Sequence, residues 1–196
     1  MRTCTVARAV PTELPTWNSC VDVDLAFAGG VYATLDVKQL GLEVETKNYD
    51  QFIRLGQEVK TALGKRAKHG DYDLYCVILY ADETHVRGLG SSDAIYQRNV
   101  TVFADGQVDR SPCGSGTCAR LAILLSEGRI VPGQTKFVHR SIIGTCFEAD
   151  ILSESASPVV GFRACVPRVR GQANLIGHMR FLIDAEDTTF PGFLLQ

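Results

Sequence analysis

The chain has 196 residues, of which 45% are hydrophobic and 21% charged, and its 20 basic and 22 acidic residues give a formal net charge of −2. This composition is typical of a soluble chain with one large domain or two small ones, and it argues against intrinsic disorder and nucleic-acid binding. No apolar run approaches the roughly 20 residues of a membrane span, and the first residues lack the pattern of a secretory signal, so we expect a cytoplasmic protein without membrane contacts.

The cysteines and histidines are scattered along the chain. The seven cysteines show neither CxxC spacing nor clustering with histidine, so we expect no metal site. Most of these thiols should behave as small buried hydrophobic groups, and only a thiol in unusual surroundings is a candidate for chemistry. Each of the four histidines is more typical of a surface or core residue than of a catalytic one: His69, His85, His139 and His178.

About eight strands are predicted from short apolar or alternating runs that end at turn residues. Residues 1–20 are expected to be a proline-punctuated lead-in. Two strands are predicted within residues 19–36, on either side of Gly29 and Gly30. The others are predicted at residues 74–80, 99–104, 136–139, 144–152, 159–169 and 174–183.

Two helices are predicted. Residues 48–63 place apolar side chains at helical spacing, whereas residues 117–126 are apolar on nearly every face and so must be wrapped by other structure. The expected caps and stops are Asn48 or Asp50, Gly64, Ser111 with Pro112, and Gly128. Together the elements predict an α+β fold in which an antiparallel or mixed sheet curls around the second, apolar helix.

The segment DRSPCGSGT, residues 109–117, carries the strongest chemical signal. It places Cys113 at the mouth of the apolar helix, and Gly114 and Gly116 leave the backbone N–H groups of the first turn uncovered. A helix N-terminus attracts a carboxylate or phosphate, and the same field lowers the pKa of an adjacent thiol. The sequence therefore predicts a thiol base beside a carboxylate-binding turn.

Other interpretations of the same segment remain open or are disfavoured. A structural turn with an inert Cys113 would also explain the composition. Residues 114–119 match the dinucleotide pattern GxGxxG/A, but a proline-containing loop separates them from the preceding strand and no acidic residue follows at the expected distance. A cysteine hydrolase would need a His/Asn arrangement that is not visible.

The string DRSPCGSGTCAR, residues 109–120, resembles the active-site motif in the C-terminal half of the proline racemase family. This family comprises cofactor-independent enzymes that act at the Cα of proline and hydroxyprolines. The resemblance extends from about Val6 to Gln196 and includes the strand pair around residues 21–32, the strands flanking the motif, and the ending at residues 171–195. It implies a fold like one lobe of diaminopimelate epimerase.

The resemblance also implies a mechanism and a set of site residues. In this family two cysteines at facing helix N-termini act as acid and base on opposite faces of Cα. Cys113 corresponds to one of these thiols. Backbone groups of Gly114 and Ser115 would bind the substrate carboxylate, Asp109 would engage the ring nitrogen, Phe103 would pack on the ring, and Cys76 would line the pocket. No cofactor is implied.

The sequence departs from the family in two ways. The family's first cysteine lies in a Met-Cys-Gly-His motif that does not occur here, so we expect the chain to correspond to the second half alone. Residues 174–196 would then return toward a missing first lobe. Exposed apolar surface is expected there, to be covered by a homodimer or by the missing half.

The second departure concerns the dehydratase branch of the family. That branch carries Thr at the position of Cys113, whereas this chain carries a thiol.

Three functional hypotheses follow. The thiol at position 113 favours a racemase or epimerase of proline or hydroxyproline, because a thiol can return the proton to Cα. The C-terminal sequence resembles the branch of trans-3-hydroxy-L-proline dehydratases. The chain could also be a catalytically incomplete, carboxylate-binding half.

Overall fold

The computed structural model describes residues 2–83, 94–189 and 192. Its strands are β1 (Thr3–Leu14), β2 (Ser19–Phe27), β3 (Val31–Asp36), β4 (Lys68–His69), β5 (Tyr72–Asp82), β6 (Ala94–Phe103), β7 (Gln107–Val108), β8 (Lys136–Ser141), β9 (Cys146–Ser155) and β10 (Ala164–Arg170). Its helices are α1 (Tyr49–Leu63) and α2 (Gly114–Ser126), with short 3-10 turns η1 (Pro15–Trp17), η2 (Val37–Leu40), η3 (Thr46–Asn48) and η4 (Gly64–Arg66). The fold is α+β, with a large mixed sheet and few helices.

The strands form a sheet whose ends meet. The order is β4-β5-β3-β2-β1-β10-β9-β8-β6-β7, and an additional pairing joins β5 to β6, so that eight strands close into a ring. β3 with β5 and β6 with β8 are parallel, and the other pairs are antiparallel. The pairing of β5 with β6 gives hydrogen-bond partners to two strands that would otherwise have an unpaired side, so most exposed sheet edges are removed.

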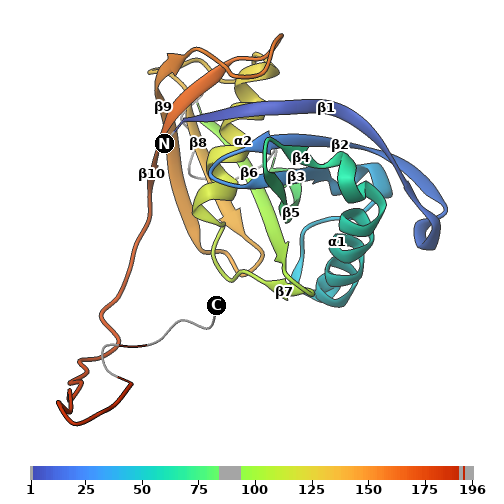
Figure 1. Ribbon diagram of the computed structural model, residues 1–196. Helices are drawn as coiled ribbons and strands as arrows, with labels where there is room; N and C mark the ends of the chain where they lie inside the picture. The colour runs from blue at the N-terminus through green and yellow to red at the C-terminus, as the bar shows by residue number, and fades with distance from the viewer. Residues whose placement is uncertain (1, 84–93, 190–191, 193–196) are drawn as a thin grey trace.

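Helix α1 covers one outer side of the strands (Figure 1). Its predicted apolar residues are all buried: Phe52, Leu55, Val59 and Leu63. They pack in one core cluster with strand residues such as Leu25, Leu35 and Val102. The approach is close at Gly56, where a Cβ would lie 2.7 Å from Cβ of Val102. The predicted stop at Gly64 is found as the C-cap of α1.

Helix α2 is buried along most of its length. Every residue from Gly116 to Leu125 is buried, and the helix packs against β1, β2, β3, β9 and β10. Its side chains join two core clusters, one near Cys113 and one toward Leu124. The helix begins at Gly114 rather than at Ser111–Pro112, because Cys113 has a positive φ of 64° that no helical residue adopts.

Two strand predictions are wrong. The expected lead-in contains the twelve-residue strand β1. Register shifts on either side of Ala7, together with Pro11, interrupt its alternation, so periodicity alone does not reveal it. Conversely, residues 174–183 form no strand. Among the described residues no neighbouring strand pairs with them, and an alternating pattern without a partner does not make a strand.

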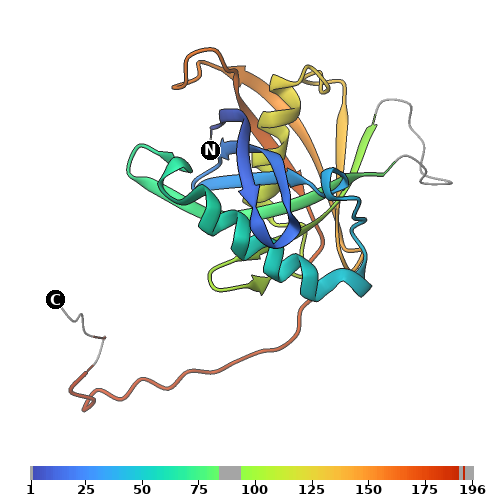
Figure 2. The ribbon, with the colours of Figure 1, turned by 90° about the vertical axis from the view of Figure 1, so that its right-hand side faces the viewer.

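The segment after β10 runs away from the body of the protein (Figures 1 and 2). It carries the expected exposed apolar surface, with relative exposures of 71–97% at Leu175, Ile176, Met179, Phe181, Leu182 and Ile183. Residues 193–195 of the resemblance lie outside the described residues. Among the described residues, no helix is both long and apolar enough to span a bilayer.

Candidate functional site

Cys113 is the N-cap of α2. Its φ of 64° and ψ of 113° turn its thiol back over the first turn, where the N–H of Gly116 donates a hydrogen bond to Sγ across 3.3 Å. The N–H of Thr117 donates to the Cys113 carbonyl at 2.8 Å and starts the helical ladder. The thiol therefore does what a Ser or Asp oxygen does at an ordinary N-cap, and it lies where the helix field is strongest.

The prediction of a lowered thiol pKa is wrong for this chain. Burial raises the pKa of Cys113, and the negative charge of Asp109 acts in the same direction. The N–H of Gly116 and the hydroxyls of Ser115 and Thr101 lower the pKa but do not offset burial. Sequence alone could show the donors of the first turn but not that the thiol would be only 8% exposed.

The glycines of the motif have distinct roles. At Gly116 a Cβ would lie 2.9 Å from Cδ1 of Ile78 and 3.0 Å from Sγ of Cys113, so a side chain there would displace the thiol. At Gly114 a Cβ would meet nothing within 4 Å, which leaves room for a ligand. Because the helical ladder starts at Thr117, the N–H groups of Gly114 and Ser115 have no intrahelical acceptor and suit an anion.

Tyr32 on β3 is a site residue that sequence reasoning did not assign. Its hydroxyl lies 2.6 Å from Oγ of Ser115, and burial raises its pKa. The phenol therefore stays neutral and remains a donor or acceptor at ordinary pH. The only sequence signal was its place in the strand pair that resembles the family. Its contact with Ser115 spans 83 residues, which no local pattern encodes.

The remaining predicted residues gather around the same helix end. Cys76 belongs to the same buried cluster as Cys113, and Phe103, its partner across β5 and β6, packs against that cluster. Burial raises the pKa of Cys76 to about 12, so it is a neutral thiol. Asp109 accepts the N–H of Ser111 at 2.8 Å and is close enough for its charge to raise the pKa of Cys76 and Cys113.

Two open hollows flank the start of α2. One is lined by Ser115 and Tyr32 together with Ala28, Gly29, Gly30, Tyr72, Asp73, Leu74 and Tyr75. The other includes Arg110 and Ser111 and continues over the loop after β8 to the segment after β10. Residues at and just before the start of α2 therefore line two hollows of the molecular surface.

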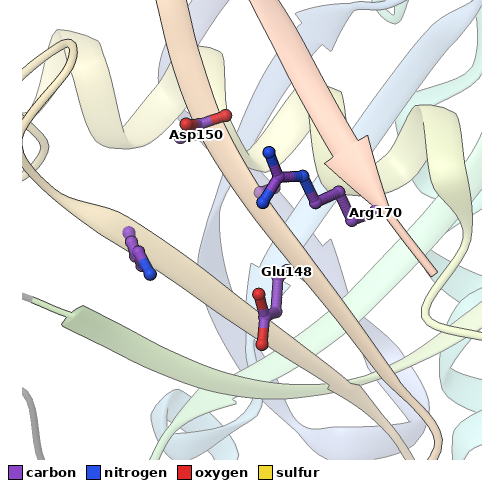
Figure 3. A pocket seen from close by; sticks show the side chains of 5 residues that line it. Glu148, Asp150 and Arg170 are labelled. Carbon is purple, nitrogen blue, oxygen red and sulfur yellow. The ribbon is translucent and has the colours of Figure 1, made fainter.

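A third hollow, on β8–β10, is different in kind (Figure 3). Glu148 and Asp150 project from β9 and Arg170 from β10, beside Lys136 of β8. Asp150 is ion-paired with Arg168, which lowers the pKa of its carboxyl. These residues form a cross-strand ladder of surface charges without a thiol or a helix end.

The described histidines have different surroundings, and none of them is hydrogen-bonded to the thiol of Cys113. The ring of His69 packs against that of Phe27 at a tilt, with ring centroids 5.0 Å apart, His178 is exposed, and His139 is fully buried. His85 is outside the described residues. Within the described part of the chain, no three His, Cys, Asp or Glu side chains are grouped to hold a metal ion.

Comparisons with known proteins show which family the chain resembles. The family model described as Proline racemase matches residues 5–194. A proline racemase of Clostridioides difficile is 36% identical over 195 residues, which cover 95% of this chain and 54% of the relative. A trans-3-hydroxy-L-proline dehydratase of Bacillus cereus is 38% identical over 192 residues, with the same two coverages of 95% and 54%. The chain spans about half the length of these curated relatives.

The fold is also similar to solved structures. A hydroxyproline epimerase from Agrobacterium vitis, solved with bound trans-4-hydroxy-L-proline, superimposes with a TM-score of 0.79 at 29% identity. The match covers 100% of this chain and 54% of the epimerase. The sequence match over nearly the whole chain and the shared fold lead to one conclusion: the chain belongs to the proline racemase family.

Proposed function

We propose that this chain supplies one half of the active site of a cofactor-independent racemase or epimerase that acts on proline or a hydroxyproline. The observation that carries the proposal is the thiol of Cys113, held 3.3 Å from the N–H of Gly116 at the N-terminus of a buried helix. The substrate carboxylate would accept hydrogen bonds from the free N–H groups of Gly114 and Ser115. This arrangement would put Cα beside the thiol.

The proposed chemistry is a proton transfer at Cα. The Cys113 thiolate takes the Cα proton, and the electrons of the C–H bond delocalise into the carboxylate, whose growing charge the helix N-terminus stabilises. In the reverse direction the thiol returns the proton. Because burial raises the pKa of Cys113, the thiol form predominates at neutral pH, and this favours the proton-donating half of the cycle. The acid or base on the other face of Cα would come from outside this chain.

The other site residues would hold the ring. Asp109 would pair with the ring nitrogen, and Phe103 and Cys76 would form the apolar wall beneath the ring. Tyr32 would hold Ser115 through its 2.6 Å hydrogen bond and so fix the first turn. We further propose that the chain folds like one lobe of diaminopimelate epimerase. In such a lobe α2 would lie at the centre of the ring of strands, with its N-terminus at the open end of the ring.

A second candidate, trans-3-hydroxy-L-proline dehydratase, is favoured by the 38% identity to the Bacillus cereus dehydratase. In that reaction the Cys113 thiolate would take the Cα proton, and the resulting thiol would pass this proton to the departing 3-hydroxyl, which leaves as water. The enamine product would then become a cyclic imine. This elimination needs a base on one face only. The dehydratase branch carries Thr at the position of Cys113, so Cys113 would take a role that the family resemblance does not give to this position.

Proton NMR in D₂O separates the two reactions. The chain is incubated with L-proline, trans-4-hydroxy-L-proline and trans-3-hydroxy-L-proline, and a Cys113→Ser variant serves as the control. Loss of the Cα–H signal with the ring intact supports the racemase or epimerase. New imine signals with the 3-hydroxy substrate support the dehydratase.

A catalytically incomplete half would still bind a planar carboxylate. Isothermal titration with pyrrole-2-carboxylate tests this third possibility without turnover. Binding by the wild-type chain without exchange of any substrate would assign the chain a carboxylate-binding role, and absence of both binding and exchange would refute the proposed site.

A further inference from the structure

The backbone of Cys113 adopts a conformation that side chains rarely tolerate. Its φ of 64° places it among only four described non-glycine residues with positive φ. Such a conformation persists only when the surrounding structure holds it in place, and it is often found at functional sites. The contacts that hold Cys113 are therefore part of the means by which the protein aims its thiol.

The carbonyl before the Cys113 amide, that of Pro112, and the carbonyl of Cys113 itself each accept a hydrogen bond from a buried side chain. The amide nitrogen Nδ2 of Asn99, on β6, donates to the Pro112 carbonyl at 2.9 Å. The hydroxyl of Thr117, on α2, donates to the Cys113 carbonyl at 2.7 Å. Asn99 and Thr117 are both fully buried, so water does not compete for these bonds.

His139 on β8 links these two side chains. Nδ2 of Asn99 lies 2.7 Å from Nε2 of His139 and 3.3 Å from its Nδ1, so Nε2 is the closer partner, whereas Nδ1 lies 2.9 Å from Oγ1 of Thr117. A carbonyl can only accept, so the Asn99 atom that faces Pro112 must be the amide nitrogen, and Nε2 must accept from that same nitrogen. Nδ1 then carries the proton and donates to Thr117, whose hydroxyl is thereby directed to the Cys113 carbonyl.

The hydrogen bonds thus require a neutral His139 with its proton on Nδ1. Burial lowers the pKa of His139 well below its usual value, and the positive charge of Arg120 acts in the same direction. A charged imidazole would place two donors, Nε2–H and the Asn99 amide, against each other. The surroundings therefore keep the imidazole in the form that the network needs.

We propose that His139, Asn99 and Thr117 form a positioning network that locks the Cys113 backbone at positive φ and so fixes the thiol over the N–H of Gly116. His139 is a positioning residue, because it reaches the thiol only through Thr117 and Asn99. The functional meaning of the network rests on the proposed role of Cys113. Its effect on the thiol is testable without turnover.

The test measures the alkylation of each cysteine by iodoacetamide from pH 6 to pH 10, with peptide mass spectrometry as the readout. Thr117→Val removes the hydroxyl at nearly constant shape, Thr117→Ser keeps the hydroxyl, and His139→Gln removes the imidazole. Thr12→Val, which removes a buried hydroxyl on β1, is the matched control. The exposed Cys20 and Cys146 report unhindered thiols, and Cys4 and Cys165 report global loosening.

In Thr117→Val and His139→Gln we expect the Cys113 alkylation rate to rise about tenfold and its pH midpoint to move toward those of Cys20 and Cys146. Thr117→Ser and Thr12→Val should keep the wild-type profile. An unchanged Cys113 profile, a Thr117→Ser profile like that of Thr117→Val, or a parallel rise at Cys4 and Cys165 would overturn the proposal.

A measurement on the wild-type chain covers the case in which a variant does not fold. Long-range ¹H–¹⁵N NMR of the histidine rings at pH 7 should show His139 neutral with the proton on Nδ1. A proton on Nε2, or a charged ring, would refute the network. Failure of the proposed function would appear separately, as absence of carboxylate binding and of Cα–H exchange while the alkylation result still holds.

Discussion

At the residue scale, the site depends on a cysteine in an unusual conformation, surrounded by groups from distant parts of the chain. The motif itself indicated Cys113 and the donors of its first turn, because helix-terminus chemistry is local in sequence. Family resemblance added Cys76, Phe103 and Asp109, which the structure brings close to the same helix end. Their roles stay predictions.

Other features of the site could not be read from the sequence. Tyr32 and His139 contact the motif across 83 and 22 residues, so their part depends on which strands pair. The direction of the Cys113 pKa shift was missed for a similar reason, because burial is a property of the folded chain and not of the motif.

Tyr32→Phe should weaken the binding of pyrrole-2-carboxylate about two- to tenfold, since the lost hydrogen bond to Ser115 is worth about 0.5–1.5 kcal/mol. Isothermal titration measures the dissociation constant. Tyr49→Phe, which removes the hydroxyl of an exposed tyrosine on α1, is the matched control and should bind as the wild type does. Equal affinities of Tyr32→Phe and wild type would show that Tyr32 does not support the turn.

Because of His139, the folded protein should be less stable in mild acid than at neutral pH. Because its pKa is lowered in the folded state, the unfolded chain takes up a proton below about pH 6.5 that the folded chain does not, and stability falls by up to about 1.4 kcal/mol per pH unit. Urea unfolding at pH 7.5 and 5.5 measures the loss.

The His139→Gln variant should lose less stability over this pH interval than the wild type. His178→Gln, which changes an exposed side chain, should lose as much as the wild type. The same pH dependence in His139→Gln and wild type would mean that the imidazole of His139 does not stay neutral in the folded chain.

At the scale of elements, the helices were easier to predict than the strands. The apolar residues of α1 at helical spacing and the continuous apolar run of α2 indicated where the helices lie, because both patterns are local in sequence. β1 was missed because bulges and a proline break its alternation. Residues 174–183 were predicted as a strand from their apolar pattern. The prediction failed because such a pattern does not supply the neighbouring strand that a strand needs.

The contact of α1 with β6 gives a stability prediction. Gly56→Ala should destabilise the protein by about 1–3 kcal/mol, because the new methyl group would lie 2.7 Å from Cβ of Val102 and the overpacking exceeds the gain in helix propensity. Urea unfolding measures the change. Arg54→Ala, on the exposed face of α1, should change stability by less than about 0.5 kcal/mol. A Gly56→Ala variant as stable as wild type would mean that α1 does not approach β6 this closely.

At the scale of the whole molecule, the described residues form a closed ring of strands with hollows beside the start of α2 and an apolar segment that leaves the body. The two hollows include Ser115 and Arg110 with Ser111, at and just before the start of α2, and the segment carries six large exposed apolar side chains between Leu175 and Ile183. We propose that both are covered by a second lobe or by a second copy of the chain, which would also bring the acid or base for the other face of Cα.

Hydrogen–deuterium exchange tests this description of the segment. Amides of residues 172–184 should exchange within seconds at neutral pH in dilute solution, since these residues have no regular secondary structure, whereas peptides from α2 in the same sample should stay protected. Protection of residues 172–184 that depends on protein concentration would indicate a homodimer. Protection at every concentration would contradict an exposed segment.

The central claim is that Cys113 moves the Cα proton, and deuterium incorporation tests it most directly. The chain is incubated in D₂O with each of L-proline, trans-4-hydroxy-L-proline and trans-3-hydroxy-L-proline, and the recovered amino acid is analysed by mass spectrometry. We predict incorporation of one deuterium at Cα of at least one substrate with the wild-type chain and none with Cys113→Ser. Equal incorporation by wild type and Cys113→Ser, or no incorporation into any substrate by the wild type, would contradict the account.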